Sequence, residues 1–436
     1  MVLGNEHDVN LAVAAAKEAY KTFSQTTKEE RIAYLQKLHD AVAKRQDELV
    51  AVMVLEYGGT YQFCKNSVNN MLSAFTTAMA TLNTFEFERT VGNSKVLMQP
   101  LGVVGLITPW NSSNSFICNK LATAISAGST VVIKPSEMSA MQTQLLLECF
   151  HEAGLPKGVF NVVNGLGTVV GNAITNHPDI AKISFTGSTV VGKSIARGAI
   201  DTLKRVTLEL GGKSPNVILD DANLETAIPM AVAAAYMNSG QACIAGTRLL
   251  VPEHKLDEVN SLVKAAVEKV KVGNPADHDT AVGPMVSKKQ YERVQGYIKL
   301  GLEEGAKLLI GGEGHPEGLE AGNFVKPTVF TNVKNSMRIA REEIFGPVLS
   351  IIAYKDEEDA IAIANDTDYG LQAYVNSSDD ARAKRVASRI IAGRVMINAL
   401  SHDPQAPFGG FKQSGIGREF GVFGLEEYVE PKTLLV

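Results

Sequence analysis

Short apolar segments alternate with helical segments between Leu101 and Leu210, and this alternation constrains the fold more than any other feature. Strands that are apolar along their whole length are buried on both faces, which is typical of a parallel sheet covered by helices. Such a sheet binds ligands beyond the carboxyl ends of its strands. The predicted strands are Val103–Thr108, Thr130–Ile133, Phe160–Val163, Ile183–Phe185 and Val206–Leu210, and the helices between them are Ser115–Ala127, Met141–Ala153, Thr168–Thr175 and Val190–Ala199.

A second alternation of strands and helices begins at Pro215. A chain of 436 residues is longer than one hydrophobic core usually serves, which favours two large domains. We therefore predict a boundary near Gly211–Gly212. The second unit is predicted to hold strands at Val217–Leu219, Leu249–Val251, Lys307–Ile310, Val325–Phe330 and Val348–Tyr354, with helices at Leu224–Met237 and Leu256–Val272.

Three further segments lie outside these two units. The residues from Val9 to Tyr61 have helical spacing, with Gly58 and Gly59 suited to end a helix. Thr81–Pro100 and Tyr428–Val436 are predicted to be extended. Exposed strands leave unpaired backbone edges that a second subunit can satisfy, so we expect these two segments at subunit contacts.

Composition excludes several classes of function. The formal charge of -5, without a long basic run, gives no electrostatic reason to expect nucleic acid or an anionic membrane as partner. No apolar stretch is long enough to span a membrane, and the N-terminus lacks a signal pattern. The four cysteines form no CxxC pair and no metal-ligand spacing with histidine. Few thiols in a long chain fit the reducing cytoplasm, and we expect no metal site.

Cys243 is the first candidate for chemistry, because small residues surround it in Asn238–Gly246. Gly240 allows a tight turn and leaves space for a ligand beside the sulfur. A helix beginning directly after Cys243 would lower the pKa of the thiol through its dipole. The alternative interpretation is a small buried hydrophobic residue.

Glu209 lies at the end of a predicted strand, and Asn111 lies shortly after another. A carboxyl among apolar neighbours is desolvated, which raises the pKa of Glu209 towards the range of a general base. An asparagine at a strand end can donate its amide hydrogens to a developing oxyanion. A solvated strand end for Glu209, and a turn capped by Trp110 for Asn111, are the alternatives.

Three segments have features of a nucleotide site. Phe185–Gly192 combines a strand, a glycine turn and a helix start, which presents backbone N–H groups to a phosphate, although it is not a GxGxxG motif. Lys134 and Glu137 can hold the two hydroxyls of a ribose. Glu342–Val348 places two carboxylates beside an aromatic ring. Each segment taken singly is also compatible with an ordinary surface turn.

In their order and spacing these motifs resemble the aldehyde dehydrogenase superfamily. The resemblance extends from about Val9 to Val436 and includes Pro109–Asn111, Lys134–Glu137, Phe185–Ser188, Glu209–Lys213, Gly240–Cys243, Glu343–Pro347 and Pro407–Gly415. It implies an α/β fold with a Rossmann-like cofactor domain, a second α/β catalytic domain and a small β oligomerisation element. The NAD-binding domain would comprise residues 1–80 and 100–211, the catalytic domain 212–405, the oligomerisation strands 81–99 and 428–436, and a return segment near the active site 406–427.

The resemblance also implies a reaction and the residues that perform it. An aldehyde would be oxidised to a carboxylic acid through a thioester on Cys243, with Glu209 activating the hydrolytic water. Asn111 and the Cys243 N–H would bind the oxyanion, and Lys120 matches a supporting lysine of the catalytic centre. NAD would be bound by Thr108, Pro109, Trp110, Lys134, Ser136, Glu137, Gly167, Phe185, Thr186, Gly187, Ser188, Gly192, Leu210, Gly211, Glu343 and Phe345. A homodimer or homotetramer is implied as well.

Particular residues refine these expectations. Glu137 favours NAD over NADP, because a carboxylate accepts hydrogen bonds from a free 2′-hydroxyl and repels a 2′-phosphate. Ser112–Ser113 follow Asn111 where an aromatic residue and a proline are common in the family, which alters the expected substrate tunnel. The chain also begins later in the family pattern than usual members, so an early β-hairpin of the cofactor domain is not expected.

Other functions on this fold stay open. A CoA-acylating aldehyde dehydrogenase releases its thioester to a thiol, but such members generally lack the glutamate found at Glu209. A catalytically inactive binding protein is a second alternative. A cysteine hydrolase is a third, although no histidine lies in a matching context.

Overall fold

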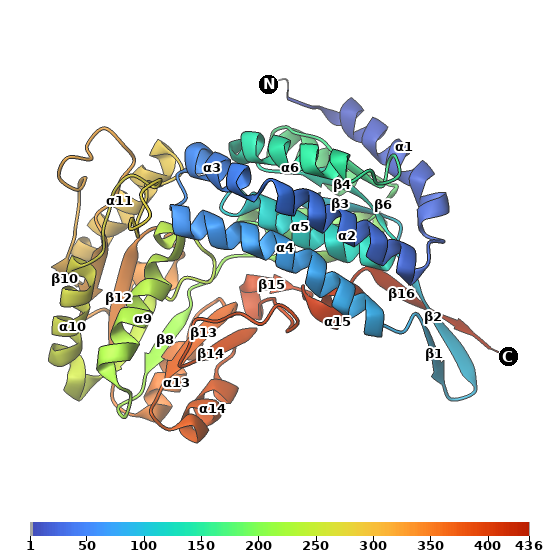
Figure 1. Ribbon diagram of the computed structural model, residues 1–436. Coiled ribbons are helices and arrows are strands. Elements are labelled where there is room, and N and C mark those ends of the chain that lie inside the picture. Colours follow the sequence, from blue (N-terminus) through green and yellow to red (C-terminus); the bar gives the residue numbers. More distant parts are fainter. Residues whose placement is uncertain (1–2, 436) are drawn as a thin grey trace.

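The computed structural model describes residues 3–435, which form three sheets with helices packed around them (Figure 1). The first sheet has the order β15-β7-β6-β3-β4-β5. Its neighbouring strands are parallel except for β15, which runs antiparallel to β7. The strands are β3 (Val103–Ile107), β4 (Thr130–Lys134), β5 (Phe160–Val162), β6 (Ile180–Thr186), β7 (Arg205–Glu209) and β15 (Gly415–Ile416).

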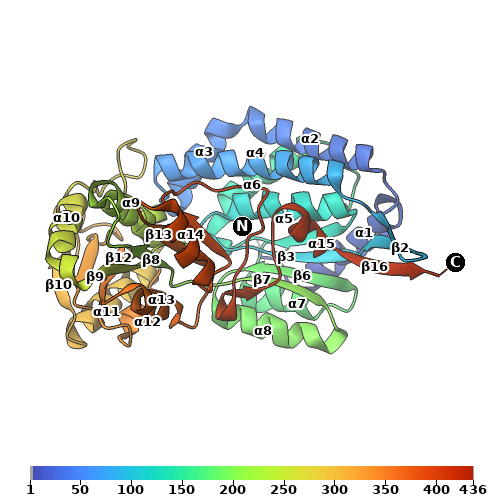
Figure 2. The ribbon, with the colours of Figure 1, turned by 90° about the horizontal axis from the view of Figure 1, so that it is seen from below.

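Helices cover both faces of this sheet, as the apolar strands predicted (Figure 2). On one side lie α5 (Ser113–Ala127) and the helices packed over it, and on the other lie α7 (Asn172–Asn176) and α8 (Thr189–Ala199). The predicted helix at Thr168–Thr175 is present as a π-helical turn, Gly167–Gly171, followed by α7. Helix α6 spans Ala140–Glu152.

The second sheet has the order β10-β11-β12-β9-β8-β13-β14 and is parallel except at its β10 edge. Its two faces bury separate clusters: Leu249 and Val251 of β9 pack against α9 and α10, whereas Leu250 faces the cluster under α11, α13 and α14. The elements are β8 (Pro215–Ile218), α9 (Leu224–Tyr236), β9 (Arg248–Pro252), α10 (Leu256–Glu268), α11 (Lys288–Glu303), β10 (Lys307–Ile310), β11 (Thr328–Thr331), α12 (Arg338–Arg341), β12 (Val348–Tyr354), α13 (Glu357–Asn365), β13 (Gln372–Asn376), α14 (Asp380–Arg389) and β14 (Arg394–Ile397).

Four helices precede the first sheet: α1 (Glu6–Phe23), α2 (Lys28–Lys44), α3 (Gln46–Tyr57) and α4 (Tyr61–Thr84). As predicted, Gly58 ends α3 with a left-handed backbone at φ 74°. The prediction that the extended segment starts at Thr81 is wrong, because α4 continues to Thr84. Its buried side chains, Val68, Met71, Phe75 and Leu82, recur at helical spacing, so the last turn packs into the same core.

A three-stranded antiparallel sheet projects from the body of the molecule (Figures 1 and 2). It consists of β1 (Glu88–Val91), β2 (Ser94–Pro100) and β16 (Val429–Leu434), with the short helix α15 (Gly421–Glu426) leading into β16. Strand β16 pairs with β2 from Val429↔Pro100 to Leu434↔Lys95 and forms one edge of the sheet. The extended character predicted for the C-terminal segment is thus present up to Leu434, and Val436 lies outside the described residues.

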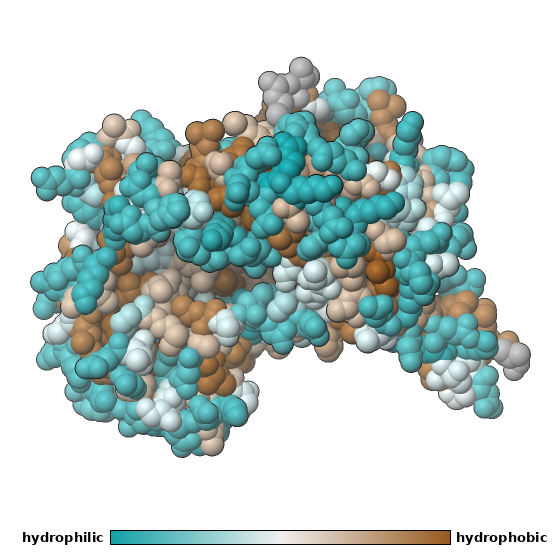
Figure 3. Space-filling view, viewed as in Figure 1, coloured by the Kyte–Doolittle hydropathy of each residue, from teal (hydrophilic) through white to brown (hydrophobic). Residues whose placement is uncertain are grey.

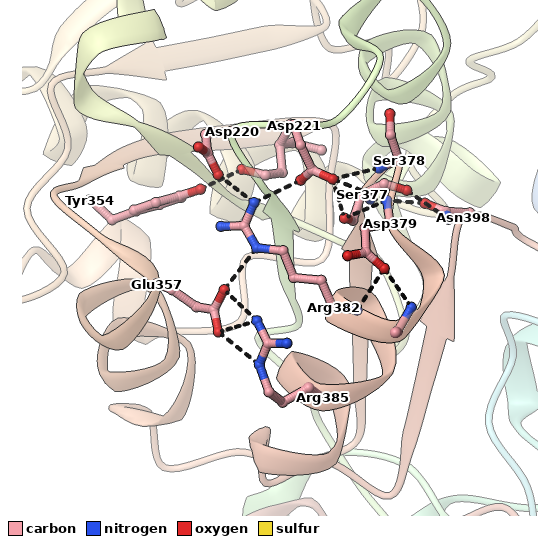
Figure 4. A network of polar contacts seen from close by, with 12 residues as sticks. Asp220, Asp221, Tyr354, Glu357, Ser377, Ser378, Asp379, Arg382, Arg385 and Asn398 are labelled. Carbon is pink, nitrogen blue, oxygen red and sulfur yellow. Dashed lines mark hydrogen bonds and ion pairs between the residues drawn. The ribbon is translucent and has the colours of Figure 1, made fainter.

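Polar contacts connect the end of β8 to α13 and α14 (Figure 4). Arg382 forms ion pairs with Asp220 at 2.6 Å, Asp221 at 3.0 Å and Glu357 at 2.8 Å. Asp221 also accepts hydrogen bonds from the Ser377 hydroxyl and from two successive backbone N–H groups. These bonds fix the turn after β13.

The surface in the orientation of Figure 1 is mixed in hydropathy and is hollowed between the halves formed by the two large sheets (Figure 3). Within residues 3–435, no helix combines the length and the apolar character needed to cross a lipid bilayer.

Candidate active site

A cleft of about 640 Å³ lies where the carboxyl ends of β3, β6 and β7 face the second sheet. The sequence placed ligand binding at these strand ends, and the structure brings twelve of the predicted site residues to the cleft. They are Pro109, Trp110, Asn111, Thr186, Gly187, Ser188, Glu209, Leu210, Gly211, Cys243, Glu343 and Phe345.

Cys243 follows a tight turn in which Asn238, Ser239 and Gly240 all have positive φ. Hydrogen bonds hold this turn in place: the Ser239 hydroxyl accepts from the Gly283 N–H, and the Gln241 side chain accepts from the Val286 N–H, each at 2.9 Å. A Cβ on Gly240 would lie 2.2 Å from the Gly346 oxygen, so only glycine fits there. Cys243 is partly exposed, whereas Cys64, Cys118 and Cys149 are buried.

The prediction of a helix directly after Cys243 is wrong, because the chain continues without a helix to β9. Burial, together with the carboxylates of Glu343 and Glu209, raises the pKa of the Cys243 thiol to about 12. The thiol therefore carries its proton at neutral pH in this arrangement, and a base has to remove it before the sulfur can attack a carbonyl.

Glu209 ends β7 with its side chain only 2% exposed. Neither carboxyl oxygen has a hydrogen-bond partner among the described residues. Burial and the neighbouring charge of Glu419 raise the pKa of Glu209 well above its ordinary value, as the sequence predicted. A carboxyl with these properties suits a general base that exchanges protons with water in the cleft.

Asn111 connects β3 to the turn that carries Cys243. Its side-chain nitrogen donates to the Gln241 carbonyl at 3.0 Å, and Asn238 donates to the Asn111 carbonyl at 3.2 Å. An asparagine amide carries two hydrogens, so one stays available for an oxyanion beside Cys243.

The loop with Glu343 and Phe345 forms the opposite wall of the cleft. The Gly212 N–H donates to Glu343 Oε1 at 3.1 Å, and burial raises the pKa of this carboxyl to about 7. Phe345 lies edge-on to Trp110, with ring centroids 5.7 Å apart. Both aromatic rings line the cleft, as Cys243 does.

A family model for the aldehyde dehydrogenase family matches residues 1–434. The chain belongs to the aldehyde dehydrogenase family. This membership confirms the resemblance inferred from the motifs.

Aldehyde dehydrogenases of several bacteria resemble the chain along its length. A 3-succinoylsemialdehyde-pyridine dehydrogenase of a Pseudomonas species is 46% identical over 435 residues, covering 99% of this chain and 91% of the relative. The structure of aldehyde dehydrogenase C of Pseudomonas syringae, with one cysteine replaced by alanine and with NAD+ and octanal bound, has a TM-score of 0.98 at 46% identity and covers 99% of this chain and 90% of its own. The structure of a betaine aldehyde dehydrogenase of Staphylococcus aureus with NAD+ bound has a TM-score of 0.96 at 36% identity. It covers 100% of this chain and 88% of its own. The predicted α/β fold is thereby confirmed.

Eight predicted residues do not line the cleft. Lys134 pairs with Glu137 at 2.9 Å at the end of β4, beside Ser136 and Thr108. Gly192 allows α8 to approach Leu210, because an added Cβ would lie 2.4 Å from its side chain. The other three are Phe185, which is buried, Gly167, which begins the π-helical turn, and Lys120.

Lys120 is 1% exposed and lies behind the cleft rather than in it. Its ammonium group is paired with Glu419 and donates to the Ser184 hydroxyl at 2.9 Å. The charges of Lys120 and Glu419 act on the pKa of Glu209 in opposite directions. Lys120 is therefore placed to influence Glu209 and not to touch a substrate.

Sequence reasoning missed the lining residues supplied by α11 and by Tyr369. Arg293 donates to the Glu343 carbonyl at 2.6 Å, and Gln290 donates to the Phe345 carbonyl at 2.8 Å, so α11 fixes the loop that bears both residues. No sequence motif marked α11, although its Ser287 N-cap could have located its start. Residues 3–435 contain no cluster of three or more His, Cys, Asp or Glu side chains suited to a metal.

Proposed function

We propose that the chain oxidises an aldehyde to a carboxylic acid with NAD+, through a thioester on Cys243. The observation that carries the proposal is that Cys243, Glu209 and Asn111, which come from three separate parts of the chain, line one cleft. Relatives of the same fold bind NAD+, and one of them binds octanal as well.

The cleft has the chemical features that NAD+ requires. Ser188 caps α8, and the buried Thr186 hydroxyl at the cleft has no partner among the described residues. The amino end of α8 favours the pyrophosphate, with Gly187 and Gly192 allowing close approach. Lys134, Ser136 and Glu137 would hold the adenosine ribose, next to Thr108 and Gly167, and Glu137 favours NAD+ over NADP+. Pro109, Trp110, Phe185, Leu210, Gly211, Glu343 and Phe345 would complete the site towards the nicotinamide.

In the first half-reaction, Cys243 loses its proton to a carboxylate of the cleft and attacks the aldehyde carbon. The S–C bond forms as the C=O π electrons move to oxygen, and the oxyanion accepts hydrogen bonds from Asn111 and the Cys243 N–H. When bound, NAD+ would accept the hydride that the carbon loses. The C=O bond then forms again, which leaves a thioester on Cys243.

In the second half-reaction, Glu209 removes a proton from water, which attacks the thioester carbonyl. Collapse of the tetrahedral adduct breaks the C–S bond and releases the acid and the Cys243 thiolate. Lys120, through Glu419, would tune the charge state of Glu209. The buried carboxyl of Glu209 favours this hydrolytic outcome over transfer of the acyl group to CoA.

Assembly and location are parts of the same proposal. The β1-β2-β16 sheet projects from the body with β16 as a strand edge, which suits pairing with a second copy in a homodimer or homotetramer. In the structure, the strands that we assign to this contact lie within Glu88–Pro100 and Val429–Leu434. Four free cysteines support a cytoplasmic location.

The test is an aldehyde panel followed by NADH absorbance, with wild type, Cys243→Ala and Cys149→Ala, the last altering a buried cysteine outside the cleft. Wild type and Cys149→Ala should form NADH, and Cys243→Ala should not. Products are analysed with and without CoA. Acyl-CoA as the main product would refute hydrolysis, and no NADH from any aldehyde would refute the enzyme assignment.

A further inference from the structure

Arg394, the first residue of β14, holds a positive charge close to the proposed nucleophile. Its Nε donates to Gln372 Oε1 at 2.6 Å, and its guanidinium lies over the Phe408 ring, 4.9 Å from the centroid. Nη1 is 2.5 Å from Nδ1 of His402. The side chain is therefore held by contacts on three sides.

Two structural links connect Arg394, which does not itself line the cleft described above, to the segments that carry Cys243 and Glu209. Arg394 is in register with Gln372 on β13, and Tyr374, on the same face of β13, donates to the carbonyl of Ile244, the residue after Cys243. Phe408 is followed by Gly409, where an added Cβ would lie 2.7 Å from Glu209 Oε1. Burial, Glu343 and Glu209 raise the pKa of Cys243, and Arg394 is the cation that acts against them.

Arg394 has no acidic partner among residues 3–435, although it is only partly exposed. Arg382, by contrast, pairs with three carboxylates (Figure 4). The side-chain contacts of Arg394 are neutral: an amide, an aromatic ring and His402. Burial and the charge of Arg394 lower the pKa of His402 to about 4, so its ring is uncharged at neutral pH and accepts from Arg394.

A guanidinium removed from water without a counter-charge is costly, and the cost falls when an anion binds. Nη2 of Arg394 makes no hydrogen bond to a described residue and can donate to a ligand. Guanidinium geometry matches a carboxylate, which can accept two parallel N–H bonds.

We propose that Arg394 binds an anionic group of the substrate, so that the enzyme prefers aldehydes bearing a terminal carboxylate over unsubstituted alkanals. The inference rests on the proposed role of Cys243 as nucleophile. One end of the substrate would lie at Cys243 and the other at Arg394. A relative solved with octanal shows that an uncharged aldehyde is the alternative in this family.

The experiment compares kcat/KM for chain-length-matched pairs: butanal with 4-oxobutanoate, hexanal with 6-oxohexanoate, and octanal with 8-oxooctanoate. At one length or more, wild type should favour the carboxylated member at least about tenfold, since leaving a buried charge unpaired is strongly selected against. Arg394→Gln should remove that preference, because loss of the charge beside Cys243 affects both members of a pair alike and cancels in their ratio, whereas Arg394→Lys should keep part of it. Arg389→Gln, which alters an exposed ion pair of α14, is the matched control and should leave both members unchanged.

Either of two results would overturn the proposal: wild type preferring the alkanal at every length, or Arg394→Gln slowing both members equally. A second readout does not depend on turnover. Adipate should protect Cys243 of wild type, but not of Arg394→Gln, from iodoacetamide better than hexanoate does, as measured by intact mass. Equal protection by the two acids would contradict anion binding at Arg394. Failure of every aldehyde to yield NADH would count against the proposed function, and the protection assay would still decide the role of Arg394.

Discussion

The side-chain amide of Asn111 donates a hydrogen bond to the backbone carbonyl of Gln241 across 3.0 Å. This bond joins the loop after β3 to Gln241, which lies two positions before Cys243. The same contact that positions the nucleophile therefore also positions the proposed oxyanion donor. Neither can shift without the other.

Asn111→Ala removes the proposed donor and leaves the Gln241 carbonyl with fewer partners. We expect kcat to fall about 100-fold, as for other oxyanion donors, with little change in NAD+ affinity measured by calorimetry. Asn172→Ala is the control, because Asn172 is an exposed asparagine of α7 that lies outside the cleft. An Asn111→Ala enzyme as active as this control would refute the role assigned to Asn111.

Glu209→Gln should stabilise the protein increasingly as the pH rises. Burial raises the pKa of Glu209, so the folded state retains a proton that the unfolded chain loses above about pH 4.3. As the pH rises, wild type therefore loses part of its free energy of unfolding. The amide of Glu209→Gln does not ionise, so the variant does not show this loss. The melting temperature of Glu209→Gln minus that of wild type should therefore grow from about pH 5 to about pH 8. A constant difference would show that Glu209 ionises as readily in the folded protein as in the unfolded chain.

Gly240→Ala should destabilise the turn that carries Cys243. Gly240 has φ 72°, and its added methyl would meet the Gly346 oxygen, so we expect a loss of about 3 kcal/mol in urea unfolding. Gly296→Ala in α11 is the matched control, because its Cβ meets open space and alanine favours a helix by about 1 kcal/mol. If both substitutions change the free energy of unfolding in the same direction, Gly240 does not carry the strain assigned to it.

Asp221→Ala tests the polar network of Figure 4. It removes one partner of Arg382 and the acceptor for the N–H groups of Ser378 and Asp379, at a cost of about 2 kcal/mol. Glu358→Ala, which breaks the exposed pair with Arg389 between the same helices, should cost less than about 0.5 kcal/mol. If Asp221→Ala and Glu358→Ala lower the free energy of unfolding in urea equally, Asp221 contributes no more than an exposed surface charge.

Much of the first sheet could be predicted, because strands such as β3 and β4 are apolar at nearly every position and buried throughout. Strands β13 and β14 were missed, because polar residues such as Gln372 and Arg394 begin them and their burial depends on distant partners. The strand predicted from Val325 begins only at Thr328, since Pro327 has no N–H to donate to a ladder.

The site divides in a similar way. Asn111, Thr186 and Glu209 were predictable because they lie at or shortly after the carboxyl ends of strands that meet at one edge. The environment of Cys243 was not, because the expected dipole needed a helix, whereas burial and the acidic side chains of Glu343 and Glu209 raise the pKa of the thiol. The lining residues on α11 come from a segment far along the chain, and only packing brings them there.

The most direct test of the account is the location of the acyl group during turnover. Glu209→Gln, mixed with NAD+ and a reactive aldehyde and quenched with acid, should form NADH once per active site and carry one acyl group on the proteolytic peptide that contains Cys243. The acyl group should persist, because water is not activated. NADH formation with Cys243 unmodified, or with the acyl group on another residue, would contradict the thioester mechanism.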